Sequence, residues 1–238
     1  MTLVIAGHLF PSIIKGGFIG VDLFFVISGF VITLQMSKLY AVNPSTFLRE
    51  FYSRRIKRIL PSALLVTIAS IVATSYFLGP VAANEAKLDG VWTTLFLGNF
   101  HFHTMSLDYF ATGTQQSSLQ HYWSLSIEEQ FYLLWPLVVF AAVKYGKANW
   151  KKWLVGVGVV AGVASLVTSI LITKGHPGAG YYLPYSRFWE ISAGALLALA
   201  GIRFDKIPNI ARAVGGWLGL IAIIGSAVFF SGSTVFPG

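Results

Sequence analysis

Apolar residues in this chain are gathered into long runs separated by short polar segments. A helix needs about 20 predominantly apolar residues to cross a bilayer, and most of the runs approach that length. The pattern therefore predicts an all-α, polytopic transmembrane bundle with about seven spans. They are expected at residues 18–36, 60–79, 123–143, 153–173, 185–201 and 212–231, with residues 1–10 as a partial first span.

One apolar run, residues 91–103, is too short for an ordinary span. We expect it to be a re-entrant or interfacial helix. His101 and His103 within it have the spacing of a strand or loop, and because no third ligand lies nearby we expect no metal site.

The basic residues indicate the topology. Thirteen of the 17 lie in three polar segments, residues 38–58, 144–152 and 203–212. Cytoplasmic loops carry an excess of Lys and Arg, so these three segments are expected to be cytoplasmic. Residues 80–122 then lie mainly on the opposite side, which requires that residues 91–103 either do not cross the membrane or cross it twice.

Composition excludes several classes of protein. Hydrophobic residues make up 55% of the chain and charged residues only 11%, against about 25% charged in soluble domains. A net charge of +8 suggests nucleic acid in a soluble protein. Here topology accounts for it, and no nucleic-acid partner is expected. Without cysteine there is no disulfide, thiol nucleophile or thiolate metal site.

Four acidic residues lie inside the apolar runs: Asp22, Glu128, Glu129 and Glu190. Each costs roughly 2.5–3.5 kcal/mol at the middle of a membrane, so we expect them to face a polar interior. Glu190 has Arg187 three residues earlier, and the two could form a purely structural pair.

Helical geometry sorts the residues of the 123–143 run. His121, Ser124 and Glu128 share one helix face, which Trp135 continues. Glu129 lies about 100° away, at a flank or against a neighbouring helix. His121 could equally be a plain helix-entry residue at the membrane interface.

His8 is a lone imidazole in an apolar segment. It is either a satisfied core histidine or a general base, since histidine titrates near neutral pH.

Four segments in this order resemble the acyltransferase type 3 family, in its O-antigen acetylase-like branch. The resemblance covers essentially the whole chain. The segments are GGFIGVDLFFVISGF at 16–30, FYSRRIKRILP at 51–61, HYWSLSIEEQFYLLWP at 121–136 and RFWEISAGALLA at 187–198.

The resemblance implies a function and a set of residues. Family members move an acyl group, often acetyl, from cytoplasmic acyl-CoA to a hydroxyl of an extracytoplasmic glycan such as O-antigen, another polysaccharide or peptidoglycan. No permanently bound cofactor and no metal are expected, and the location implied is the bacterial inner membrane. Catalytic roles are expected for His8, Asp22 and Glu128. Substrate-binding roles are expected for Ser28, Arg54, Arg55, Arg58, His121, Trp123, Ser124, Glu129, Arg187 and Glu190.

The residues also suggest a mechanism. His8 could deprotonate a glycan hydroxyl or accept the acyl group first, and Asp22 could orient the imidazole. The basic residues Arg54, Arg55, Lys57 and Arg58 suit the phosphates of CoA, or they only set the topology.

Two departures from the family pattern concern the ends. An Arg expected about eleven residues before His8 and further spans after residue 238 are not in this sequence. We therefore expect residues 1–238 to form one membrane-embedded acyltransferase domain, incomplete at both termini, without a soluble domain. The alternatives are a transporter or flippase of an envelope precursor, since intramembrane carboxylates also suit ion relays, and an inactive shortened relative.

Overall fold

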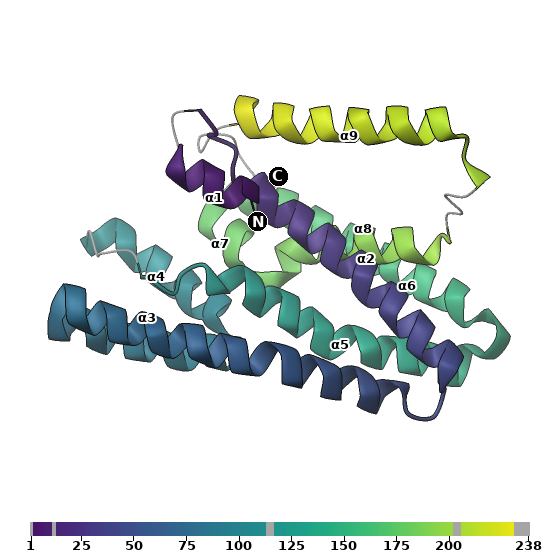
Figure 1. Cartoon of the computed structure of the whole chain (residues 1–238), viewed down its shortest axis with the longest axis horizontal. Coiled ribbons are helices and arrows are strands. Elements are labelled where there is room, and N and C mark those ends of the chain that lie inside the picture. Colours follow the sequence, from purple (N-terminus) through teal and green to yellow (C-terminus); the bar gives the residue numbers. More distant parts are fainter. Residues whose placement is uncertain (1, 11–12, 113–116, 202–205, 231–238) are drawn as a thin grey trace.

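The fold is a bundle of helices (Figure 1). A computed structural model describes residues 2–10, 13–112, 117–201 and 206–230, excluding the side chains of Thr2, His8, 106–112 and Pro177. Every regular element in these ranges is helical, which confirms the all-α prediction. The elements are α1 (Thr2–Leu9), α2 (Ile19–Val42), α3 (Phe47–Thr94), α4 (Gly98–Thr112), α5 (Tyr122–Gly146), η1 (Lys147–Asn149), α6 (Trp150–Thr173), α7 (Pro177–Tyr182), α8 (Pro184–Leu199) and α9 (Asn209–Phe229).

Helix α3 is a hairpin of two helical arms. Gly79, between the two arms, has φ 86° and ψ −177°, a conformation that glycine adopts without strain, and Pro80 follows it. A Cβ on Gly90 would lie 2.8 Å from Ile71 Cδ1 and 3.2 Å from Thr67 Cγ2. The second arm, from Pro80 on, therefore runs back along the first, as Figure 1 shows.

The chain reverses again between α3 and α4, inside the predicted short segment 91–103. Phe96 at this turn has φ 55°, which is uncommon for a residue other than glycine. Its carbonyl accepts a hydrogen bond of 2.9 Å from Gln130 Nε2 of α5. Irregular backbone at membrane depth is tolerated where protein buries it, so the turn suits a re-entrant segment. The strand or loop expected around His101 is wrong, because α4 continues through it.

Four stretches are long and apolar enough to span a membrane, among the residues described: Ile19–Val42, Phe47–Thr94, Tyr122–Thr173 and Asn209–Phe229. The predicted count of about seven is not confirmed. The stretch Phe47–Thr94 contains the Gly79 reversal, and Tyr122–Thr173 contains both α5 and α6. Helix α8 has 16 residues, fewer than an ordinary span needs.

Helix α8 lies between α2 and α6, with the closest approach at two glycines. A Cβ on Gly29 would lie 1.9 Å from the Ile191 carbonyl oxygen, and one on Gly194 would lie 1.8 Å from that of Val26. The two backbones are therefore in direct contact, as small residues allow in membrane bundles. On the other side of α8, Gly158 of α6 packs against Leu196.

Helix α9 is set apart from the other helices (Figure 1). Of its described residues only Ala227 is buried. The Ala227 carbonyl accepts a hydrogen bond of 2.9 Å from the Gly16 N–H.

Candidate functional site

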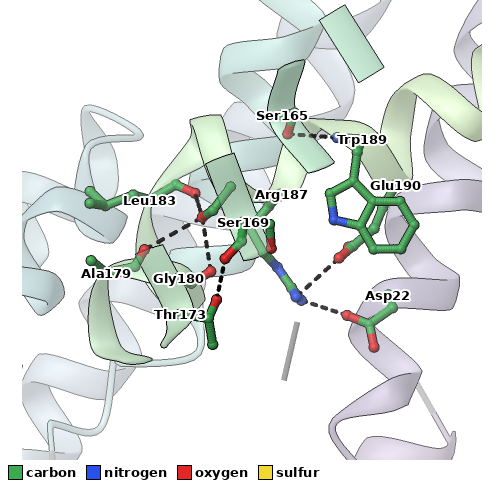
Figure 2. Close-up of polar contacts among 11 residues, drawn as sticks. Asp22, Ser165, Ser169, Thr173, Ala179, Gly180, Leu183, Arg187, Trp189 and Glu190 are labelled. Carbon is green, nitrogen blue, oxygen red and sulfur yellow. Dashed lines mark hydrogen bonds and ion pairs between the residues drawn. The ribbon is translucent and has the colours of Figure 1, made fainter. Parts of the chain in front are cut away.

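Arg187 of α8 lies at the centre of a buried ion-pair network (Figure 2). Its Nη2 donates to Asp22 Oδ1 of α2 at 2.5 Å, and its Nη1 lies 3.0 Å from Glu190 Oε1, one turn further along α8. The side chains of Arg187 and Glu190 are each 1% exposed and that of Asp22 is 14% exposed. One buried cation thus holds two carboxylates, which offsets the cost of burying all three.

Aromatic rings enclose the guanidinium. Its central carbon lies 5.6 Å from the ring centroid of Phe25, 5.7 Å from that of Trp123 and 5.8 Å from that of Tyr181. These distances are typical of cation–π contacts. Burial raises the pKa of the Tyr181 phenol to about 12, so the ring remains neutral at physiological pH.

Two of these rings also line a cavity of about 790 Å³. Trp123 and Tyr181 line it, together with residues of α1, the segment before α2 and the start of α5. The predicted substrate-binding residues His121 and Ser124 line it as well. Trp123 and Tyr181 therefore belong both to the wall of the cavity and to the surroundings of Arg187.

His8 lies in α1 between Gly7 and Leu9, and both of these neighbours line the cavity. Its side chain is outside the described part of the structure, so its predicted catalytic role stays a prediction. The predicted partner of that imidazole, Asp22, is bound through Oδ1 to Arg187. Its other oxygen, Oδ2, is buried and has no hydrogen-bond partner among the described residues.

Glu128 lies between α2 and α5, held by two hydroxyl groups. Ser28 Oγ donates to Glu128 Oε1 at 2.5 Å, and the Tyr132 hydroxyl donates to the same oxygen. Farther along the same face of α5, Trp135 Nε1 donates to Thr33 Oγ1 of α2 at 2.9 Å. The face predicted to carry functional residues thus meets α2 at Glu128 and Trp135.

The residues of the predicted basic cluster have different surroundings in the structure. Arg55 turns toward α5, with its guanidinium carbon 3.9 Å from the centroid of the Tyr132 ring. Arg54 is exposed and pairs with Glu50 at 3.0 Å, one turn earlier in α3. Arg58 is exposed. CoA binding by these residues stays a prediction.

Sequence reasoning missed the contacts that fix the α3–α4 turn. Gln130 Nε2 donates to Asn99 Oδ1 at 2.8 Å as well as to the Phe96 carbonyl, and Asn99 Nδ2 donates to the Tyr182 carbonyl at 3.3 Å. Asn99 is fully buried. Two uncharged carboxamides inside otherwise apolar helical segments, Asn99 and Gln130, were the sequence signal for these contacts.

A second cluster that was not predicted connects the second arm of α3 with α4 and with the segment that follows α4. Asp89 Oδ1 lies 2.7 Å from His101 Nε2, and Ser117 Oγ donates to Asp89 Oδ2. The His101 ring stacks on Trp92 with 5.6 Å between centroids. Serine and histidine bind different oxygens of the carboxylate, so this is no nucleophile–base pair. No group of three or more potential metal ligands occurs among the described residues.

Comparisons with known proteins place the sequence in a family. Residues 1–237 match the family described as acyltransferase domain. The chain is 34% identical over 228 residues to the peptidoglycan O-acetyltransferase OatA of Listeria monocytogenes, covering 93% of this chain and 36% of that protein. It is 31% identical over 229 residues to the O-acetyltransferase OatA of Staphylococcus aureus, covering 96% of this chain and 37% of that protein. It therefore spans just over a third of the length of these two relatives.

No solved structure matches the chain. The match to the family model covers nearly every residue, and the two relatives share about a third of their aligned residues with it. The chain therefore belongs to the acyltransferase domain family.

Proposed function

We propose that this chain is the membrane-embedded acyl-transfer part of an O-acetyltransferase. It takes an acetyl group from acyl-CoA and passes it to a hydroxyl of an envelope glycan, with peptidoglycan as the first acceptor to test. The observation that carries the proposal is the shared aromatic wall: Trp123 and Tyr181 line a cavity beside α1 and also contact Arg187, which holds Asp22 and Glu190.

The relatives and the cavity support this choice. Both relatives are named as O-acetyltransferases, and one is named for peptidoglycan. The cavity volume of about 790 Å³ lies within the range of roughly 300–1,000 Å³ usual for small-molecule sites. Its polar lining, which includes Lys15, Gln120, His121 and Ser124, suits an acceptor that carries several hydroxyl groups.

The transfer of the acetyl group needs only one base, which takes a proton from the hydroxyl and later returns it to the leaving thiol. The glycan hydroxyl oxygen attacks the thioester carbonyl carbon as the His8 imidazole takes the hydroxyl proton. The C–S bond then breaks, the thiol sulfur leaves with the electron pair, and the imidazolium returns the proton to it. If His8 takes the acetyl group first, the same bonds form and break in two steps.

Asp22 is assigned an orienting role in this scheme. Arg187 holds the carboxylate through Oδ1, and Oδ2 has no partner among the described residues. That oxygen is the proposed acceptor for an imidazole N–H of His8, which would fix the tautomer and stabilise the imidazolium. Arg187 is then a positioning residue, because it acts on His8 only through Asp22.

The phosphates of the donor are assigned to the opposite, basic end of the bundle, and only its acyl thioester has to reach His8. The segments 38–58, 144–152 and 203–212 carry most of the basic residues, and the positive-inside rule makes them cytoplasmic in an inner-membrane protein. Acyl-CoA is found in the cytoplasm, and its phosphates suit guanidinium groups such as those of Arg54 and Arg58.

The test is acetylation in a bacterial host that lacks its own peptidoglycan O-acetyltransferase. We expect O-acetylated muropeptides, measured by mass spectrometry, when the chain is expressed. His8→Ala and Asp22→Asn should each lower the yield at least 100-fold with unchanged membrane levels, whereas Lys152→Gln, at an exposed position, should not.

Full activity of His8→Ala would contradict the role given to His8. If the purified chain transfers no label from radiolabelled acetyl-CoA to any envelope glycan, the transporter or the inactive relative replaces the proposal. Uptake of a labelled envelope precursor into vesicles separates those two.

A further inference from the structure

A second cavity, of about 320 Å³, lies between α3 and α5. Its floor is the α3–α4 turn, which Gln130 holds against α5. None of its lining residues lines the cavity beside α1. The scheme for acyl transfer above does not use it.

The wall of this cavity is mostly apolar and its rim is exposed. Ile56, Leu95 and Leu133 on the rim are 58%, 60% and 60% exposed. In a chain that spans a membrane, exposed apolar side chains at such positions face lipid. A ligand can therefore bring a hydrocarbon part into the cavity without crossing a polar surface.

Two polar groups in the wall are available to a ligand. Glu129 Oε1 is buried and has no hydrogen-bond partner among the described residues, although a buried acceptor left unsatisfied costs about 1–3 kcal/mol. Arg55 brings a positive charge, held flat against the Tyr132 ring.

The other polar side chains in the wall already have partners. Tyr52 donates to the Leu133 carbonyl at 2.8 Å, and Gln130 donates to the Phe96 carbonyl and to Asn99. The cavity thus offers one cation and one hydrogen-bond acceptor beside an apolar slot.

We propose that this cavity binds an anionic phosphate amphiphile. The phosphate pairs with Arg55, the chain lies between Ile59, Leu60 and Leu97, and a hydroxyl or amide on the ligand donates to Glu129 Oε1. Two sources share this chemistry: a phospholipid with a hydroxylated headgroup, such as phosphatidylglycerol, and the phosphopantetheine arm of an acyl thioester. With a lipid as the ligand the proposal is separable from acetyl transfer, because a lipid can occupy the cavity in an inactive chain; with the thioester arm as the ligand it rests on the proposed function.

The experiment measures binding to the purified, delipidated chain in a neutral detergent by native mass spectrometry. Phosphatidylglycerol and acetyl-CoA are titrated separately. Ile59→Trp fills the slot, and Arg55→Gln removes the charge. The matched control is Leu65→Trp, on the same helix at a 69% exposed position that does not line the cavity.

We expect at least one probe to bind, with affinity at least tenfold lower in Ile59→Trp and Arg55→Gln and unchanged in Leu65→Trp. Glu129→Leu should weaken binding about threefold to tenfold, the value of one hydrogen bond. Glu129→Gln keeps an acceptor oxygen and should stay within twofold of wild type.

The two titrations identify the source of the ligand. Binding of phosphatidylglycerol alone assigns a lipid, and binding of acetyl-CoA alone assigns the thioester arm. If neither probe binds, or if Ile59→Trp binds both as wild type does while its circular dichroism is native, the proposal is overturned. Muropeptide acetylation by Ile59→Trp, measured in parallel, reports separately on the proposed function.

Discussion

Two regions of this bundle bury acidic groups in opposite ways. Between α2 and α8, Asp22 and Glu190 share one guanidinium, Arg187, that is almost completely buried. Between α2 and α5, Glu128 is held by the neutral hydroxyls of Ser28 and Tyr132, and the nearby Arg55 lies on a ring face. The first region is an ion-pair lock and the second a hydrogen-bond contact, so removing one partner should cost far more in the first.

The largest effect is expected from Arg187→Leu. The substitution leaves two buried carboxylates without their cation, and breaking a buried ion pair in this way costs about 3–5 kcal/mol. We expect the protein to be recovered at low levels and to unfold at a much lower temperature, followed by tryptophan fluorescence in detergent. Tyr132→Phe, which removes one neutral donor to Glu128, is the paired measurement and should cost about 0.5–1.5 kcal/mol. If both variants lost the same free energy of unfolding, the ion-pair region would not be more sensitive than the hydrogen-bonded region.

Gly29→Ala is expected to have the next largest effect. The new Cβ would lie 1.9 Å from the Ile191 carbonyl oxygen, so α2 and α8 must separate, which costs roughly 1–3 kcal/mol as overpacking. Separation also lengthens the Asp22–Arg187 contact, so acetyl transfer should fall further than stability alone predicts. The control is Gly156→Ala in α6, where no atom lies within 4 Å and stability should not fall. A Gly29→Ala protein with wild-type melting temperature and activity would show that the helices do not touch at this point.

An effect of similar size, but confined to one turn of the fold, is expected from Gln130→Glu at the contact between α5 and the α3–α4 turn. A carboxylate of the same shape cannot donate to the Phe96 carbonyl or to Asn99, so two hydrogen bonds are lost, for about 1–3 kcal/mol. Because the change acts on the α3–α4 turn, hydrogen exchange at residues 95–100 should rise while that of α8 stays unchanged. An equal rise in hydrogen exchange at residues 95–100 and in α8 would show that the turn does not open independently of α8.

The sequence predicted helices better than it predicted their pairing. Long apolar runs identified α2, α5, α6 and α9, because lipid leaves a spanning segment few alternatives to helix. The hairpin at Gly79 was not predicted, because one glycine followed by proline inside an apolar run does not show that the chain reverses. The run 185–201 had the composition of a span, yet α8 has 16 residues, and burial between α2 and α6 explains its apolar character equally well.

In the candidate site, the sequence pattern identified the charged residues but not the residues that they contact. The spacing of Arg187 and Glu190 indicated their pair, since three residues is less than one helical turn. The ion pair of Arg187 with Asp22 joins residues 165 positions apart, and no local spacing encodes such a contact. Residues that fix the α3–α4 turn, Asn99 and Gln130, looked ordinary in sequence because an amide carries no charge to stand out from an apolar run.

The ion pair between Asp22 and Arg187 also has a consequence for membrane insertion, because Asp22 is synthesised first. Asp22 leaves the ribosome 165 residues before its partner, a wait of about 8–33 s at roughly 5–20 residues per second. During that interval α2 holds an acidic side chain that costs roughly 2.5–3.5 kcal/mol in hydrocarbon, so we expect it to stay beside the insertion machinery until α8 arrives. Chains arrested before residue 187 should crosslink to that machinery through α2, and an Asp22→Asn chain should be released earlier.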